Sequence, residues 1–351
     1  MEKALQKTVW VDDIKLVATL AVIVLHVASP AFFLEYNSFS ESNTNWWIAN
    51  FYGSFCRFCV PLFIMITGAL LLPQKIGLKL FLQKRLKRIV LPFIFWVAVY
   101  ITFNIGLKIK YGGFVALKNI GLLLYEQLIQ GPSIHLWYVY MIIGLYLFIP
   151  IIKPWVQQAS NQAILYFLGI WLVIVTVNQL KIITISSPFD LRYFSSYLGY
   201  LVLGYYLAHR VTITKTLKKL SVIIFILGFL ATLTGTYLAS QQNNFFSHDY
   251  YDYLTLNVIL ASLGMFLFIK SWRPIEGKTS YTTVRNFINK YGFGIYLGHV
   301  LIINILSYFG IDYCLTTLWL SIPSVALVCL ILTCLMIYIL DKLPYGKFIS
   351  R

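Results

Sequence analysis

Two side chains near the start of the sequence have the chemistry and the spacing of paired functional groups. Lys15 and His26 lie eleven positions apart in one apolar stretch. Eleven steps of an α-helix make about three turns, so both would project from one face, ~16 Å apart along the axis. A neutral imidazole suits a general base. The alternatives are a packed core histidine and a lysine that extends to a membrane surface.

Arg57 is a third candidate for a catalytic residue. It stands in the apolar segment that begins at Trp46, about 16 Å into that segment if it is helical. A guanidinium at such a depth must contact protein, water or an anionic ligand. We therefore expect Arg57 to serve function or to form a structural ion pair.

A basic segment, residues 84–88, comes before the next apolar run and contains Arg85 and Arg88. We interpret it as a loop with two possible roles. It can be a topology signal that contacts anionic lipid, which is the simpler reading. It can also be a cytoplasmic patch that binds phosphate groups.

Two further histidines stand beside aromatic residues. His135, Trp137 and Tyr138 open one apolar stretch, and His299 lies about 12 Å into another if that stretch is helical. Tryptophan and tyrosine at this place are typical of the membrane interface. The added histidine is also consistent with a polar mouth that receives a sugar ring.

The elements that must position these groups follow from composition. Of the 351 residues, 59% are hydrophobic and only 11% are charged, against about 25% in soluble domains. This excludes an ordinary soluble enzyme and a disordered chain and indicates an all-α, polytopic membrane protein. We expect about ten transmembrane helices, over residues 10–33, 46–72, 89–107, 134–152, 163–180, 194–208, 217–239, 254–269, 291–309 and 315–340.

The positive charge agrees with that topology. With both termini cytoplasmic, 21 of the 28 Lys and Arg residues fall in inside segments and five in outside loops. Basic residues gather on the cytoplasmic side of membrane proteins, so the net charge of +16 does not require nucleic acid as a partner. Residues 114–130 are predicted to form an amphipathic surface or re-entrant segment.

We expect a single domain over residues 1–351. No nucleotide-binding loop or zinc-ligand spacing is found, so we expect no metal. Cys56 and Cys59 have redox-motif spacing, but within an apolar span we interpret them as packing residues.

Several segments, taken in order, resemble signatures of the acyltransferase-3 family of bacterial integral-membrane O-acyltransferases. Lys15 replaces the family's usual arginine, and Thr67 stands where serine is common. The chain looks closest to the stand-alone subgroup that includes the enterobacterial common antigen O-acetyltransferase. The segments that carry the resemblance are Lys15 to His26, Arg57 to Leu72, Arg85 to Pro92, His135 to Tyr138 and Phe293 to His299.

The resemblance implies transfer of an acetyl or other short acyl group from cytoplasmic acyl-CoA to a sugar hydroxyl of a surface glycan or its lipid-linked precursor. Acetyl-CoA would be a co-substrate rather than a bound cofactor, and the site would lie in the bacterial inner membrane. His26, Lys15 and Arg57 would be catalytic, and Arg85 and Arg88 would bind acyl-CoA. The acceptor would meet His135, Trp137, Tyr138 and His299. The alternative function is a transporter or flippase for a glycan or lipid-linked sugar.

Overall fold

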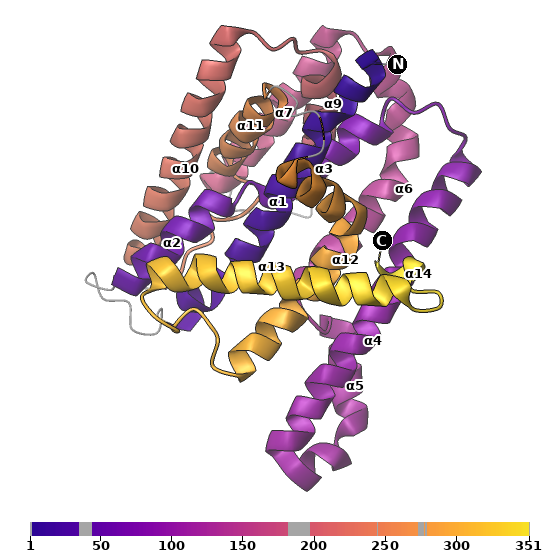
Figure 1. Ribbon diagram of the computed structural model, residues 1–351. Helices are drawn as coiled ribbons and strands as arrows, with labels where there is room; N and C mark the ends of the chain where they lie inside the picture. Colours follow the sequence, from indigo (N-terminus) through magenta and orange to yellow (C-terminus); the bar gives the residue numbers. More distant parts are fainter. Residues whose placement is uncertain are drawn as a thin grey trace.

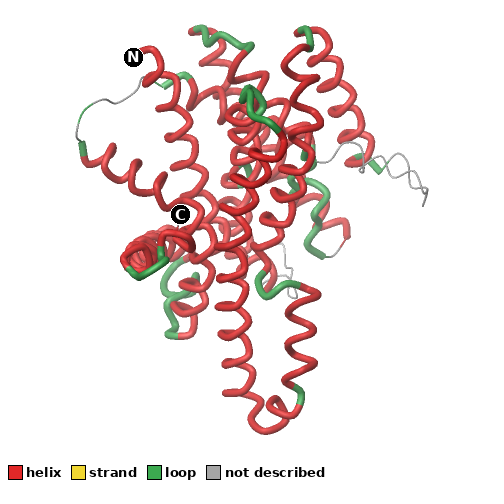
Figure 2. The backbone as a smooth tube through the Cα atoms, turned by 90° about the vertical axis from the view of Figure 1, so that its right-hand side faces the viewer, coloured by secondary structure: helices red, strands yellow, loops and turns green. Residues whose placement is uncertain are grey.

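A computed structural model describes residues 2–34, 44–181, 197–243, 245–272, 277 and 279–350. All regular secondary structure in these ranges is helical (Figures 1 and 2). The elements are α1 (Glu2–Leu34), α2 (Thr44–Cys56), α3 (Cys59–Leu71), α4 (Leu78–Lys118), α5 (Ile120–Gln130), the 3-10 turn η2 (Ile134–Leu136), α6 (Trp137–Gln158), α7 (Asn161–Gln179), α9 (Leu198–His209), α10 (Lys215–Asn243), α11 (Leu256–Lys270), α12 (Ser280–Tyr308), α13 (Leu318–Lys342) and α14 (Lys347–Ser350).

The chain is an all-α polytopic membrane protein, as the composition predicts. Eight helical segments of the described chain are long and apolar enough to cross a membrane, and α11 is a shorter apolar helix. Each of the ten predicted spans overlaps a helix, although residues 194–196 of the sixth lie outside the described residues. The number of crossings and the side of each terminus remain predictions.

The second predicted span is not one continuous helix. It breaks at Arg57 and Phe58 into α2 and α3. Pro61 explains the break, because a proline has no N–H to donate to the carbonyl four residues earlier, which is that of Arg57, and its ring clashes with that carbonyl. The break leaves Arg57 between two half-helices.

One prediction about the segments around α4 is wrong. The basic segment 84–88 is not a loop but part of the first turns of α4, because lysine, arginine and leucine are good helix formers. Residues 114–130 complete α4 and form α5, which turns back beside α4 in a projecting hairpin (Figure 2). Their expected role as an amphipathic surface or re-entrant segment stays a prediction. Asn104 Nδ2 donates to Gln127 Oε1 at 2.6 Å across this hairpin.

Glycines let α3 and α9 approach each other closely. In the α3–α9 contact, a Cβ added at Gly68 would lie 1.8 Å from the Leu201 carbonyl oxygen, and one at Gly204 would lie 2.0 Å from that of Met65. Without a hydrophobic driving force between helices in lipid, such close backbone packing stabilises the bundle. Helix α3, which forms one wall of the candidate site, is thereby fixed against α9.

A buried ion pair joins α1 to α12 near the N-terminal end of α12. Asp13 and Arg285 are 3% and 7% exposed, and Arg285 Nη1 donates to Asp13 Oδ1 at 3.2 Å. Tyr281 Oη donates to the same oxygen at 2.7 Å. Asn289 Nδ2 donates to the Asp12 carbonyl at 3.1 Å. These bonds fix the register between the helices that carry Lys15, His26 and His299.

Candidate active site

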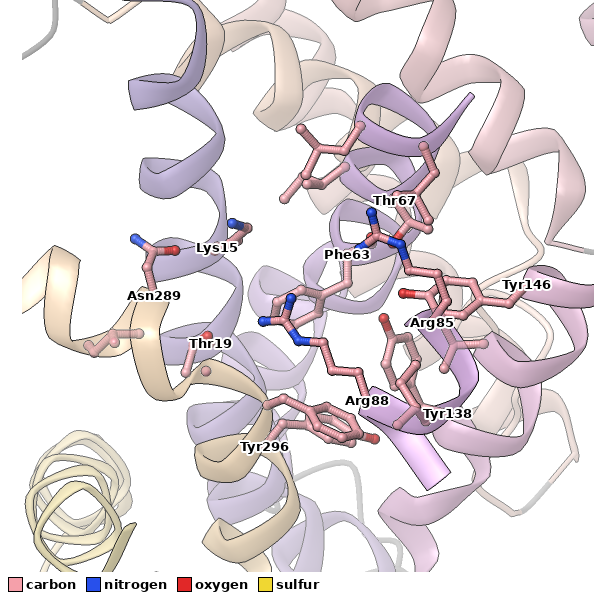
Figure 3. A pocket seen from close by; sticks show the side chains of 18 residues that line it. Lys15, Thr19, Phe63, Thr67, Arg85, Arg88, Tyr138, Tyr146, Asn289 and Tyr296 are labelled. Carbon is pink, nitrogen blue, oxygen red and sulfur yellow. The ribbon is translucent and has the colours of Figure 1, made fainter. Parts of the chain in front are cut away.

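A cavity of about 260 Å³ lies between α1, α3, α4, α6 and α12 (Figure 3). Lys15 and Asn289 line one side, and Arg85 and Tyr138 line the opposite side. Four residues singled out from the sequence therefore meet at one cavity, although they come from three distant helices. The four are Lys15, Arg85, Arg88 and Tyr138.

The cavity carries positive charge without a matching negative group in its wall. Three lining residues are cations, and none is a carboxylate. Lys15 pairs with Asp12 outside the cavity at 3.3 Å, and Arg85 Nη2 donates to Gln74 Oε1 at 3.2 Å. Within the described chain, Arg88 has no ion pair or hydrogen bond from its side chain, and Figure 3 shows its guanidinium extending into the cavity. This arrangement suits a ligand that carries phosphate groups.

A narrow extension leads from the cavity towards the histidines. Thr19, Phe63 and Tyr296 line both the cavity and the extension, and His299 lines the far end. The extension is too narrow to hold a water molecule in this conformation. The basic cavity and the histidines are therefore neighbours separated by packed side chains.

Three histidines from distant parts of the sequence form one cluster. The ring centroids of His26 and His299 are 4.9 Å apart, and those of His135 and His299 are 5.2 Å apart. His26 and His135 are separated by 6.1 Å. They come from α1, η2 and α12, so the fold joins a predicted catalytic residue to two residues predicted to bind the acceptor.

The hydrogen bonds of the cluster fix which nitrogens carry protons, because a carbonyl oxygen only accepts. His26 Nδ1 donates to the Val22 carbonyl at 2.8 Å, and His299 Nδ1 donates to the Tyr296 carbonyl at 2.6 Å. Neutral His299 then has a lone pair on Nε2, which lies 3.2 Å from His26 Nδ1. His26 in turn keeps a lone pair on Nε2, for which the described residues provide no hydrogen-bond partner.

Burial separates the roles of the three rings. His135 is 1% exposed and His299 is 0% exposed, whereas His26 is partly exposed. His135 Nε2 donates to the Leu297 carbonyl at 3.2 Å, and its Nδ1 accepts from Ser133 Oγ at 2.8 Å. Of the three residues, only His26 is partly exposed and also has an unused lone pair, which a base or a nucleophile requires.

Arg57 lies outside the basic cavity, although its cation is within electrostatic reach of His26. Its guanidinium carbon is 3.9 Å from the ring centroids of both Tyr251 and Tyr253, and its Nε donates to the Tyr251 carbonyl. Two aromatic faces and a carbonyl satisfy this cation where α2 ends. The pKa of His248, in the same loop, is lowered mainly by burial and secondly by the nearby Arg57 cation. Arg57 thus anchors the loop between α10 and α11 and does not line the basic cavity.

Trp137 and Tyr138, both predicted to bind the acceptor, point to different places. Trp137 is 36% exposed, and its ring stacks on Tyr253 with centroids 5.7 Å apart. Tyr138 is 8% exposed and lines the basic cavity beside Tyr296. Consecutive helical residues differ by about 100° in direction, which accounts for the separation.

Asn289 and Thr19 line the cavity but are not among the residues that the sequence singled out. Asn289 occurs one turn before Gly292 and Phe293 and two turns before Tyr296, all on the cavity face of α12. That periodicity leading to His299 is a signal that sequence reasoning could have used. Among the described residues, no group of three His, Cys, Asp or Glu side chains is placed to hold a metal ion.

The fold and the site define a multi-pass membrane protein that combines a basic internal cavity with a deep imidazole cluster. Comparison with protein families then identifies the kind of protein. A sequence profile described as "Acyltransferase domain" matches residues 8–341, and the chain belongs to this acyltransferase-3 family. Searches of curated proteins and of solved structures found no match.

Proposed function

We propose that the protein moves an acetyl or other short acyl group from cytoplasmic acyl-CoA to a sugar hydroxyl of a cell-surface glycan or its lipid-linked precursor. The observation that carries the proposal is an anion-attracting cavity whose narrow extension reaches His299, which contacts His26, the histidine that has an unused lone pair. Membership of an acyltransferase family favours this reaction over the alternative of a transporter or flippase. By the same resemblance, we place the protein beside the stand-alone subgroup of O-acetyltransferases in the bacterial inner membrane.

In this proposal the donor enters at the basic end of the cavity. Lys15, Arg85 and Arg88 hold the diphosphate of acyl-CoA, since guanidinium and ammonium groups form strong charge-assisted bonds to phosphate. The arm that carries the thioester then follows α1 and α12 towards His26. Phe63 and Tyr296 must move apart to admit it, because they close the narrow extension.

His26 is the proposed base. Its Nε2 accepts the proton of the acceptor hydroxyl while the hydroxyl oxygen bonds to the thioester carbon. The carbon–sulfur bond then breaks, and the imidazolium returns the proton to the departing CoA thiolate. His299 is the proposed positioning residue, because its Nε2 lone pair shares the Nδ1–H of His26 with the Val22 carbonyl, and both acceptors favour the charged ring. A relay through an acyl-histidine at the same Nε2 is an equally balanced route.

The acceptor is proposed to approach from the side of Trp137 and Tyr253. Their stacked rings, with Trp137 partly exposed, offer an apolar face of the kind against which a sugar ring packs. Arg57 holds the loop that contains Tyr253, so we assign it to positioning this platform. His135 supports the cluster from behind through its bond to the Leu297 carbonyl.

The proposal is tested by measuring transfer of the labelled acetyl group from acetyl-CoA with the purified protein reconstituted in membranes. His26→Ala is expected to abolish acyl transfer, whereas the protein still inserts and is recovered in normal amounts. His209→Ala is the matched control, because His209 bonds to the Ala69 carbonyl outside the cluster and its loss is expected to leave transfer unchanged. Transfer at the wild-type rate in His26→Ala would refute the role of the base. Mass spectrometry of surface glycans with and without the gene identifies the acceptor and the acyl group.

A further inference from the structure

A second basic pocket lies beside the cavity, between the first turns of α4 and the short helix α14. Its volume is about 420 Å³. Four of its seven lining residues are basic and none is acidic, and the basic residues are Lys84, Lys87, Arg88 and Lys347. Nothing in the reaction proposed above uses Lys84, Lys87 or Lys347.

The cations of this pocket have no negative partner in the described chain. No ion pair or side-chain hydrogen bond is formed by Lys84, Lys87 or Lys347 with the described residues. Like charges held close together repel, and an anion between them removes the repulsion. A ligand with a concentrated negative charge therefore fits the pocket.

Lys347 is held in place and is not on a loose end of the chain. Trp96 Nε1 of α4 donates to the Ile349 carbonyl at 3.2 Å, and Ser350 Oγ donates to Asp341 Oδ1 at 2.9 Å. Ser350 is fully buried. These contacts seat α14 against α4 and α13, so Lys347 faces the basic residues of α4 across a fixed gap.

Arg88 lines both the cavity and this pocket. A single ligand can therefore place one phosphate group beside Lys15 and Arg85 and another beside Lys347. Acyl-CoA carries a diphosphate and, one ribose away, a 3′-phosphate monoester. A phosphate monoester carries a charge of about −1.5 to −2 at pH 7, which suits several cations together.

We propose that the pocket between α4 and α14 binds the 3′-phosphate of the donor nucleotide, so that the enzyme recognises acyl-CoA by two separate phosphate contacts. This proposal rests on the proposed function. The apolar side chains of Leu80 and Phe348, which also line the pocket, are available to the adenine ring. An anionic phospholipid headgroup also presents a phosphate group, in the form of a diester. The experiment below distinguishes binding of the donor nucleotide from binding of such a lipid.

The test compares CoA with dephospho-CoA, which lacks only the 3′-phosphate. Binding is measured by titration calorimetry on the full-length protein in neutral-lipid nanodiscs. The wild-type protein is expected to bind CoA at least about tenfold more tightly than dephospho-CoA, as expected for a hydrogen bond to a charged group. Lys347→Ala is expected to remove that difference by weakening CoA binding alone. Lys84→Ala, on the opposite wall, is expected to act in the same direction and provides a second variant.

Lys342→Ala is the matched control, since Lys342 ends α13 near α14 but does not line the pocket, and it is expected to keep the wild-type preference. Equal affinity of the wild-type protein for the two ligands would overturn the proposal. So would an effect of Lys347→Ala that requires anionic lipid in the nanodisc, because the pocket would then hold a headgroup. Failure of the wild-type protein to bind either ligand would overturn the proposed donor as well, which distinguishes the two failures.

Discussion

Replacing Gly204 by alanine should force α3 and α9 apart. The new Cβ would lie 2.0 Å from the Met65 carbonyl oxygen, and the equivalent change at Gly68 would place a Cβ 1.8 Å from that of Leu201. Cβ atoms essentially never approach other heavy atoms closer than 3.0 Å. Each alanine therefore requires a local separation of at least about 1.0 to 1.2 Å. Both obstacles are backbone atoms, so no side-chain rotation can remove them.

The expected destabilisation is about 2–3 kcal/mol for each alanine, at the upper end of the usual cost of overpacking. The two glycines act on one interface, so a single separation of the helices accommodates both alanines. The double variant should therefore cost less than the sum of the two single variants, with a coupling of about 1 kcal/mol or more. Because α3 also carries Phe63 and Thr67, the same variants should raise the KM for the donor.

The assay is thermal unfolding of the purified protein in detergent. The loss of helix is monitored by circular dichroism, and the thermal midpoint is compared between variants. Gly144→Ala in α6 is the control, since a Cβ there meets nothing within 4 Å. It is expected to be neutral or to stabilise by up to about 1 kcal/mol. The reasoning would be refuted if Gly204→Ala unfolded with the same free energy as the wild-type protein. It would also be refuted if the losses of the two single variants were strictly additive in the double variant.

Three further predictions concern other parts of the molecule. Arg285→Ala should cost about 3–5 kcal/mol, because it leaves the buried Asp13 carboxylate without its cation; adding Asp13→Asn should recover part of the loss in the same unfolding assay. Gly292→Leu should raise the donor KM without loss of stability, since a Cβ at this cavity-lining position meets nothing within 4 Å; an unchanged KM would contradict the assigned cavity. His248 has a lowered pKa in the folded protein, so the unfolded chain binds more protons as the pH falls below about 6.5. Stability should therefore fall from pH 7 to pH 5, and His248→Gln should reduce that fall in thermal midpoint.

Local chemistry made much of the fold and some of the site predictable. Apolar runs of sufficient length indicate helices because backbone groups in lipid must be satisfied within the chain. An imidazole or guanidinium in such a run is costly, which drew attention to His26, His299 and Arg57. Their identification as candidates needed no knowledge of tertiary structure.

The meeting of these residues was not predictable, because it depends on how distant helices cross. The 4.9 Å contact between His26 and His299 arises where α1 packs on α12, far apart in sequence. Arg57 was expected to serve function or to form an ion pair, but two tyrosines of a distant loop enclose it. Tyr138 was assigned to the outer mouth with Trp137, yet the two point to different places because of helix geometry alone.

Lys15 and His26 stand on the same uninterrupted helix, α1, so the helix alone fixes the distance between them along its axis. Their spacing is set by a rise of about 1.5 Å per residue and does not depend on any loop. If Lys15 holds the phosphate end of the donor and the acyl carbon is attacked beside His26, the donor needs an arm that spans about three helical turns. Short donors such as acyl phosphates would then be rejected by length alone. Inserting one residue between the two positions would turn the histidine by about 100° away from the lysine's face.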